Sequence, residues 1–314
     1  MNTLISKRHK LNFYLTVTLG SLAFLAIGTR LLIVYVKHSR SGQLNNKEQL
    51  IPFISIGVFF LAFYTIYKYY KNTPIIVVDS TGISFNRDHF AFSDLVNIEL
   101  TGKASFPYLI GFSMEAATLK FKSGHTKYIF DSMYENSGQL KLFLRQVIIE
   151  KGDFIHISTD KVEQPELDGE SYDTFKGNQL LSFRGVLLWG AIVFFTYSAF
   201  TTTTTRKTAS LAVYIFFTLL WLILHSLFMN YFKVSQNFLV INNHNLFWRI
   251  KAYRLADIQE VVFETQGKMP NCLRVISRDF RSKLYPAATL RDKTWLELKD
   301  KLESRKITVR NECI

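Results

Sequence analysis

The sequence predicts a polytopic α-helical membrane protein with α+β soluble domains, built from two repeats of a helical hairpin followed by a small β-rich domain. Three observations indicate this class. Apolar residues gather into four long runs, and a strand-rich segment follows each pair of runs. Residues 74–101 also match residues 237–264 without a gap, at an offset of 163 positions. An internal repeat of this kind bears on the architecture before any local pattern does.

The two copies agree in their apolar positions more than in their identities. Ile75–Val78 corresponds to Phe238–Ile241, and the polar identity that both copies retain is Asp94 with Asp257. We predict that each Asp forms a turn at the start of a strand, where its carboxylate accepts backbone N–H groups. Acid–base catalysis is the alternative, but no His, Ser or Lys stands at a matching position beside both.

Composition limits the possible partners. The chain has 314 residues, and its 38 Lys and Arg against 25 Asp and Glu give a net charge of +13. Such a balance suits nucleic acid or an anionic membrane surface. No stacking aromatics are interleaved with the basic residues, so no nucleic-acid partner is expected. Cys272 and Cys313 form no ligand cluster, and two idle thiols are favoured over a disulfide.

A basic N-terminus, residues 1–10, precedes the first predicted transmembrane hairpin, 11–72, with spans at 11–36 and 50–70. At about 1.5 Å per residue, each span can cross a hydrocarbon core of ~30 Å. A cleaved signal peptide is the alternative for the first run. The apolar run resumes after Arg30, which favours an uncleaved helix. We expect Arg30 to extend its side chain to the interface.

The second predicted hairpin, 180–232, has spans at 180–200 and 211–232 and follows an acidic, solvated linker at 153–179. His225 lies in the last span without an Asp or Glu in reach. An interfacial or helix-facing imidazole is therefore favoured over a proton relay.

The distribution of basic residues predicts the orientation. Those on the side of the N-terminus are Lys7, Arg8, Lys10, Lys68, Lys71, Arg184 and Lys233, and those in the connecting loops are Lys37, Arg40, Lys47, Arg206 and Lys207. The positive-inside bias favours both termini and both soluble domains in the cytoplasm. We expect a multi-pass protein of the cell (inner or plasma) membrane.

The soluble domains, 73–152 and 233–314, are each predicted to contain strands closed by a helix. The predicted strands are 75–79, 82–86 and 95–100 in the first domain, and 238–242, 245–250 and 258–263 in the second. The predicted β-hairpins are 117–130 and 272–285, and the predicted helices are 139–150 and 291–304. The second copy lacks about nine residues before its hairpin, because Leu119 aligns with Leu273 at an offset of 154.

The segments Phe92–Leu95 and Leu255–Ile258 each place Asp one residue before a further strand, although Leu255 stands where an aromatic residue is expected. This step, within a strand-rich segment that ends in a helix, resembles bacterial pleckstrin-homology-like (PH-like) domains. Two transmembrane helices ahead of such a domain are similar to small bacterial membrane proteins of that family. The resemblance implies a small β-sandwich or partly open barrel capped by a helix, and it implies binding more than catalysis.

The two β-hairpins carry the candidate site, a basic surface for contact with anionic lipid headgroups. Its predicted residues are Arg274, Arg278, Arg281 and Lys283 in the second domain, and Lys120, Lys122 and Lys127 in the first. Residues 233–314 hold 16 Lys and Arg against 9 Asp and Glu, whereas residues 71–150 hold 8 of each. Each basic charge near an anionic membrane contributes about 1 kcal/mol. The alternative is that these charges mark only the solvated face of each hairpin.

No dinucleotide-binding, P-loop, zinc-protease or nucleophile-elbow motif is present, so we expect no enzyme, no cofactor and no metal site. The sequence favours a membrane-tethered interaction or scaffolding protein whose partners are the lipid bilayer and an unidentified protein. A transporter or channel is an alternative, although the spans offer only Arg30, Arg184 and His225 as polar candidates. Sensing of anionic lipid by the second domain is another.

Overall fold

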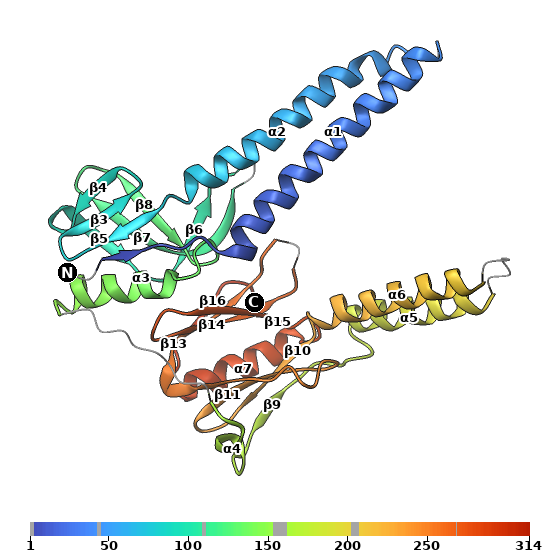
Figure 1. Ribbon diagram of the computed structural model, residues 1–314. Coiled ribbons are helices and arrows are strands. Elements are labelled where there is room, and N and C mark those ends of the chain that lie inside the picture. The colour runs from blue at the N-terminus through green and yellow to red at the C-terminus, as the bar shows by residue number, and fades with distance from the viewer. Residues whose placement is uncertain (1–2, 43–44, 109–110, 153–161, 202–206, 268) are drawn as a thin grey trace. The chain divides into compact units, whose positions relative to one another are not determined.

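The computed structural model of the chain describes residues 3–42, 45–108, 111–152, 162–201, 207–267 and 269–314. It contains helices and sheets and divides into two compact units, Met1–His156 and Ile157–Ile314. In each unit, a pair of long helices projects from a body of mainly antiparallel strands (Figure 1). The start of the predicted linker, 153–161, and residues 202–206 of the loop between the last two predicted spans lie outside the described residues.

The first unit begins with a short strand, β1 (Leu4–Ile5), in a stretch predicted only as a basic N-terminus. β1 pairs antiparallel with β2 (Ile76–Val78), the first strand after the helices. The elements between them are a π-helical segment (Lys10–Leu15), α1 (Thr16–Arg40), a 3-10 turn (Glu48–Leu50) and α2 (Ile51–Asn72). The helical hairpin is therefore inserted between two neighbouring strands of one sheet.

Two sheets and one helix complete the first unit. The first sheet has the order β1-β2-β3-β4, with β3 at Gly82–Phe85 and β4 at Asp88–Ala91. The second contains β5 (Leu95–Glu99), β6 (Lys103–Phe106), β7 (Phe112–Phe121) and β8 (Thr126–Phe130), and β7 pairs with the other three. Helix α3 (Ser137–Leu144) continues into a π-helical segment (Arg145–Ile149). The strands and α3 together bury one core, which includes Leu119, Phe130 and Leu140.

The base of the first helical hairpin belongs to this core. Phe13, Val17 and Tyr69 are buried in the same hydrophobic cluster as the residues of the sheets. The predicted span 11–36 is therefore corrected at both ends. Helical structure runs continuously over Lys10–Arg40, and its first turns pack on the domain.

The second unit repeats the insertion of helices between paired strands. Its first elements are α4 (Gln164–Leu167), β9 (Asp173–Phe175), α5 (Phe183–Thr201), α6 (Lys207–Ser226) and β10 (Asn230–Val234), and β9 pairs antiparallel with β10. Two predictions are corrected here. The linker predicted to be solvated to residue 179 contributes β9 to the sheet. The last span does not extend to Phe232, because residues 230–232 pair with the next strand.

The remaining strands of the second unit also form two sheets around one core. They are β11 (Phe238–Asn243), β12 (Lys251–Arg254), a 3-10 turn (Leu255–Asp257), β13 (Ile258–Glu264), β14 (Cys272–Ser277) and β15 (Ser282–Pro286). After α7 (Asp292–Ser304), β16 (Val309–Asn311) pairs parallel with β13. Trp295 of α7 is fully buried, with ring centroids 5.6 Å from Phe232 and 4.9 Å from Phe263. The helix therefore closes a core that both sheets share.

The strand order corrects the gap-free alignment of the two copies. β3 and β11 are each the second strand after a helical hairpin, so β11 corresponds to β3. The alignment instead set Phe238–Ile241 of β11 against Ile75–Val78, which contains β2. The next connection differs in length, since two residues link β3 to β4 and seven link β11 to β12. Residues 245–250, predicted as a strand, lie in this longer loop. Buried strands share one apolar pattern, so the sequence did not distinguish neighbouring strands.

Within the described residues, three helical segments are long and apolar enough to cross a membrane. They are Lys10–Arg40, Glu48–Asn72 and Phe183–Thr201, and Leu211–Ser226 is a shorter apolar helix. Three of the four predicted spans therefore correspond to helices of sufficient length. The fourth corresponds to α6, whose apolar part, Leu211–Ser226, is shorter.

Candidate functional site

The ends of α5 and α6 define one end of the second domain. The N–H of Ala288 donates a 2.9 Å hydrogen bond to the carbonyl of Phe228, two residues after α6. β15 runs away from this contact, from Pro286 back to Ser282. At about 3.3 Å per residue, the turn before Ser282 lies roughly 13 Å further from the helices. The basic hairpin of this domain therefore points away from the helix ends.

The basic hairpin of the first domain likewise points away from the helices of its own unit. The hydroxyl of Tyr108 lies 2.6 Å from Thr65 Oγ1 in α2, which places this loop beside the helix. Tyr108 follows Phe106, which pairs with Phe112 at the start of β7. Lys120 stands eight residues further along the same strand, at a distance of about 27 Å. We call the helix-side ends of the two domains their near ends and the tips of the basic hairpins their remote ends.

Arg274 is not part of an exposed basic surface. Its side chain is buried, and Nε and Nη2 donate to Glu264 Oε1 at 3.0 and 2.6 Å, while Nη1 donates to Ser282 Oγ at 2.7 Å. Arg278 does not lie on the same strand face as Arg274, because β14 ends one residue earlier, at Ser277. The predicted role of Arg274 in headgroup contact is therefore corrected to that of an internal ion pair.

Three further predicted residues are held by neighbours in their own domain. Arg281 Nε lies 2.5 Å from Asp279 Oδ2, Lys127 Nζ lies 3.3 Å from Asp88 Oδ2, and Lys122 Nζ donates to the carbonyl of Ser93 at 2.8 Å. Burial raises the pKa of Asp279, but hydrogen bonds from Ser277 and Arg281 outweigh it and hold that pKa below its ordinary value. The other three residues, Arg278, Lys283 and Lys120, are exposed.

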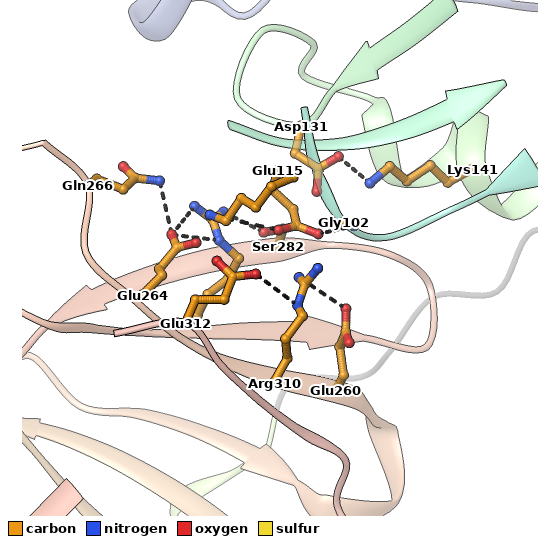
Figure 2. Close-up of polar contacts among 12 residues, drawn as sticks. Gly102, Glu115, Asp131, Lys141, Glu260, Glu264, Gln266, Ser282, Arg310 and Glu312 are labelled. Carbon is orange, nitrogen blue, oxygen red and sulfur yellow. Dashed lines mark hydrogen bonds and ion pairs between the residues drawn. The ribbon is translucent and has the colours of Figure 1, made fainter. Parts of the chain in front are cut away.

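The acidic partners of the second domain were missed in the sequence analysis. Gln266 Nε2 donates to Glu264 Oε1 at 3.0 Å, and Arg310 lies 3.5 Å from Glu260 and 3.3 Å from Glu312 (Figure 2). These contacts join side chains from β13, β16 and the loops that follow them. The positive charges of Arg274 and Arg310 are therefore neutralised within the domain. The available signal was Glu264 directly after the predicted strand 258–263 and Arg274 in the predicted hairpin that follows.

A second buried ion pair lies in the first domain. Lys141 of α3 is fully buried and pairs with Asp131, which is 8% exposed (Figure 2). The carboxylate of Glu115 accepts a 2.6 Å hydrogen bond from the N–H of Gly102. Removing one partner of such a pair costs stability, because the other charge is left buried without its partner. We assign them a structural role.

Asp94 and Asp257 take the turn role that the sequence predicts. Each ends a 3-10 turn, and each main-chain carbonyl accepts a 2.8 Å hydrogen bond, from the N–H of Lys122 and of Arg278 respectively. The accepting group is thus the carbonyl rather than the predicted carboxylate. Each turn ties the start of one strand to the tip of the basic hairpin.

The sequence analysis also missed two aromatic residues at the near end of the second domain. Phe247 and Trp248 lie in the loop between β11 and β12 and are 76% and 69% exposed. Asn242, Asn243 and Asn245 precede them, and this run of turn-forming residues was the available signal for a loop.

Among the described residues, no group of three or more His, Cys, Asp or Glu side chains is placed to hold a metal ion. Cys272 and Cys313 are both free. No protein-family model matches the sequence, and no curated protein is significantly similar to it. The functional conclusion therefore depends on the near and remote ends of the two domains.

Proposed function

We propose that the protein is a membrane-anchored, non-enzymatic interaction or scaffolding protein. In this proposal, two helical hairpins cross the cell membrane four times, and each carries a PH-like domain in the cytoplasm. The unit of hairpin and domain is duplicated. Three apolar helices of sufficient length and two strand-rich bodies, each with its own hydrophobic core, support this proposal.

One observation carries the proposal, namely that each helical hairpin is inserted between paired strands. β1 pairs with β2 across the first hairpin, and β9 pairs with β10 across the second. In the first unit, Phe13 and Tyr69 also extend the domain core into the base of the helices. A domain connected in this way is held at a fixed distance from the bilayer, which suits the presentation of a binding surface.

The remote ends are the surfaces that this arrangement presents to the cytoplasm. Arg278 and Lys283 in the second domain and Lys120 in the first are exposed there. Along the strands from the near ends, Lys283 lies at about 10 Å, Arg278 at about 13 Å or more and Lys120 at about 27 Å, all beyond a Debye length of about 8 Å. Attraction to the membrane that holds the helices is thus strongly screened. A protein partner with an acidic surface suits these charges better than lipid does.

Transport is less well supported by the positions of the polar side chains. Arg184 lies at the base of α5 with its guanidinium 4.8 Å from the ring of Phe228, and the ring of His225 stacks on Trp221 at 4.0 Å. Both side chains therefore contact aromatic rings close to the helix-side end of the second domain. A flux abolished by Arg30→Ala and His225→Ala would favour the transport alternative instead.

In-cell photo-crosslinking tests the proposal. A benzophenone amino acid replaces Arg278 in the full-length protein, and adducts are identified by mass spectrometry. The same probe at Phe53, which is 71% exposed on α2, is the matched control for lipid contact. We expect reproducible adducts to one other protein from position 278, and lipid adducts from position 53.

Lipid adducts from position 278 would contradict the interaction role and favour lipid sensing. Labelling of an Arg278→Cys variant by a membrane-impermeant maleimide in intact cells would show that the domains face the exterior. The absence of lipid adducts from both positions would contradict membrane insertion itself.

A further inference from the structure

The loop between β11 and β12, residues 244–250, exposes an unusual amount of apolar surface. Phe247 is 76% exposed, Trp248 is 69% exposed and Ile250 is 50% exposed. Arg249 lies between them and is also exposed. Adjacent exposed aromatic and aliphatic side chains on one loop are typical of an interaction site.

The loop has a defined conformation. Asn243 Oδ1 accepts hydrogen bonds from the N–H groups of Asn245 and Leu246 at 3.1 and 2.9 Å. The N–H of Arg249 donates to the carbonyl of Leu246 at 2.8 Å, which closes a turn. Phe247 and Trp248 are the two central residues of this turn. Their exposed position is therefore set by a hydrogen-bonded turn.

The base of the loop is attached to the ends of both membrane helices of its unit. Asn245 Nδ2 donates to the hydroxyl of Ser226, the last residue of α6, at 2.9 Å. Asn243 Nδ2 donates to the carbonyl of the same serine at 2.7 Å. Gln179, four residues before α5, donates from its side-chain amide to Asn245 Oδ1. The base of the loop thus lies close to the start of α5 and the end of α6.

The first domain needs no such loop at the same connection. Only Asn86 and Arg87 link β3 to β4, and Asn86 adopts a positive φ of 55°, which suits a tight turn. An aromatic residue reaches the helices from another connection there, since Tyr108 contacts Thr65. Both near ends therefore carry aromatic side chains on loops, half-buried at Tyr108 and exposed at Phe247 and Trp248.

We propose that the loop Leu246–Ile250 inserts Phe247 and Trp248 into the interface of the bilayer that holds α5 and α6. Trp is enriched at membrane interfaces because its ring is apolar and its N–H remains hydrated. Arg249 then lies at the level of the lipid phosphates, where a guanidinium binds bidentately. The insertion gives the second domain a third attachment to the membrane besides its two helices. This inference rests on the proposed membrane insertion of the hairpin.

Spin labelling of the full-length protein in liposomes of phosphatidylcholine and phosphatidylglycerol tests the inference. Single cysteines replace Trp248, Arg278 and Val193 in a Cys272→Ala, Cys313→Ser background. Collision with oxygen and with a water-soluble nickel complex reports the depth of each label. We expect the label at 248 to favour oxygen, as does the label at Val193, which is 67% exposed on α5. The label at Arg278 should favour nickel.

The outcomes separate the inference from the proposed function. Suppose that the label at 193 lies in lipid but the label at 248 is as accessible to nickel as the label at 278. This outcome overturns the inference and leaves the proposed function standing. A label at 193 exposed to nickel overturns membrane insertion and with it both proposals.

A second measurement keeps the native cysteines and covers the case in which the cysteine-free background fails to fold. Lipids brominated near the headgroup should quench the fluorescence component that Trp248→Phe removes. Quenching of that component by aqueous iodide, without quenching by the brominated lipid, contradicts insertion.

Discussion

Ser55 Oγ donates a 2.6 Å hydrogen bond to the main-chain carbonyl of Gly28, which joins α2 to α1. Ser55 is fully buried, and a Cβ atom at position 28 would lie 2.7 Å from the ring of Phe59. The first hairpin therefore packs through small residues that bring the two backbones close together, as membrane helices commonly do.

Gly28→Leu should separate α1 from α2. The added side chain has no room beside Phe59, so we expect a loss of about 1–3 kcal/mol in the stability of the first unit. Thermal unfolding of the protein in detergent measures this loss. Gly57→Leu is the matched control, because nothing lies within 4 Å of a Cβ at that position. Equal effects of the two substitutions would contradict close packing at Gly28.

Phe13→Ala should destabilise the first β domain even though Phe13 lies in a helical segment. The ring is fully buried in the domain core, and its loss leaves a cavity that costs about 3–5 kcal/mol. Denaturant unfolding followed by near-ultraviolet circular dichroism measures the change. Phe53→Ala removes the same side chain from a position that is 71% exposed, and it should have little effect. A domain that unfolds unchanged in Phe13→Ala would show that the hairpin base is independent of the core.

Arg274→Ala should destabilise the second domain by about 3–5 kcal/mol, because it leaves Glu264 buried without this arginine. The paired substitution Arg274→Met with Glu264→Leu should recover much of the loss, since it removes both charges. Lys283→Ala, on the same hairpin but exposed, should change the stability by less than about 0.5 kcal/mol. Denaturant midpoints of the four proteins measure these differences. A double variant no more stable than Arg274→Ala would argue against the ion pair as the cause.

His244 should make the second domain sensitive to acid. Burial lowers the pKa of its imidazole from the ordinary value of 6.5, and the charge of Lys176 lowers it further. The unfolded chain therefore binds a proton more readily than the folded domain does, and stability is lost as pH falls from 6.5 toward the lowered pKa. Thermal unfolding between pH 7.5 and 5 should show a steeper loss for the wild type than for His244→Gln. Parallel curves would exclude His244 as the titrating group.

Local patterns were sufficient to predict much of each domain. The hairpin 272–285 is confirmed by β14 and β15, and the closing helix 291–304 by α7. Alternating apolar residues identify paired strands, and a helical period identifies the helix, without knowledge of the rest of the chain. The helices 11–36 and 50–70 are also present, with different ends.

Contacts between distant segments were not predictable in the same way. β1 is two residues long, and its pairing with β2 depends on a return of the chain through both helices. Arg274 fits the pattern of a solvated strand face, and only the position of Glu264 on the neighbouring strand shows that it is buried. The sequence predicts a strand around Trp248, because the apolar residues of this loop match those of β3. The orientation of the loop depends on hydrogen bonds to Ser226, which is far from it in sequence.

In the proposed topology, the pairing of β1 with β2 would also tie folding of the first sheet to membrane insertion of its hairpin. β1 leaves the ribosome before either helix of its hairpin, and β2 leaves after both. In the proposed topology, the chain crosses the bilayer and returns, which brings the two strands to the same side, whereas a single crossing would leave them on opposite sides. A wrongly inserted hairpin would expose an incomplete sheet, which proteases and chaperones can recognise. If the helices span the membrane as proposed, the first sheet of each unit would act as a checkpoint against a half-inserted hairpin, since it could not close after a single crossing.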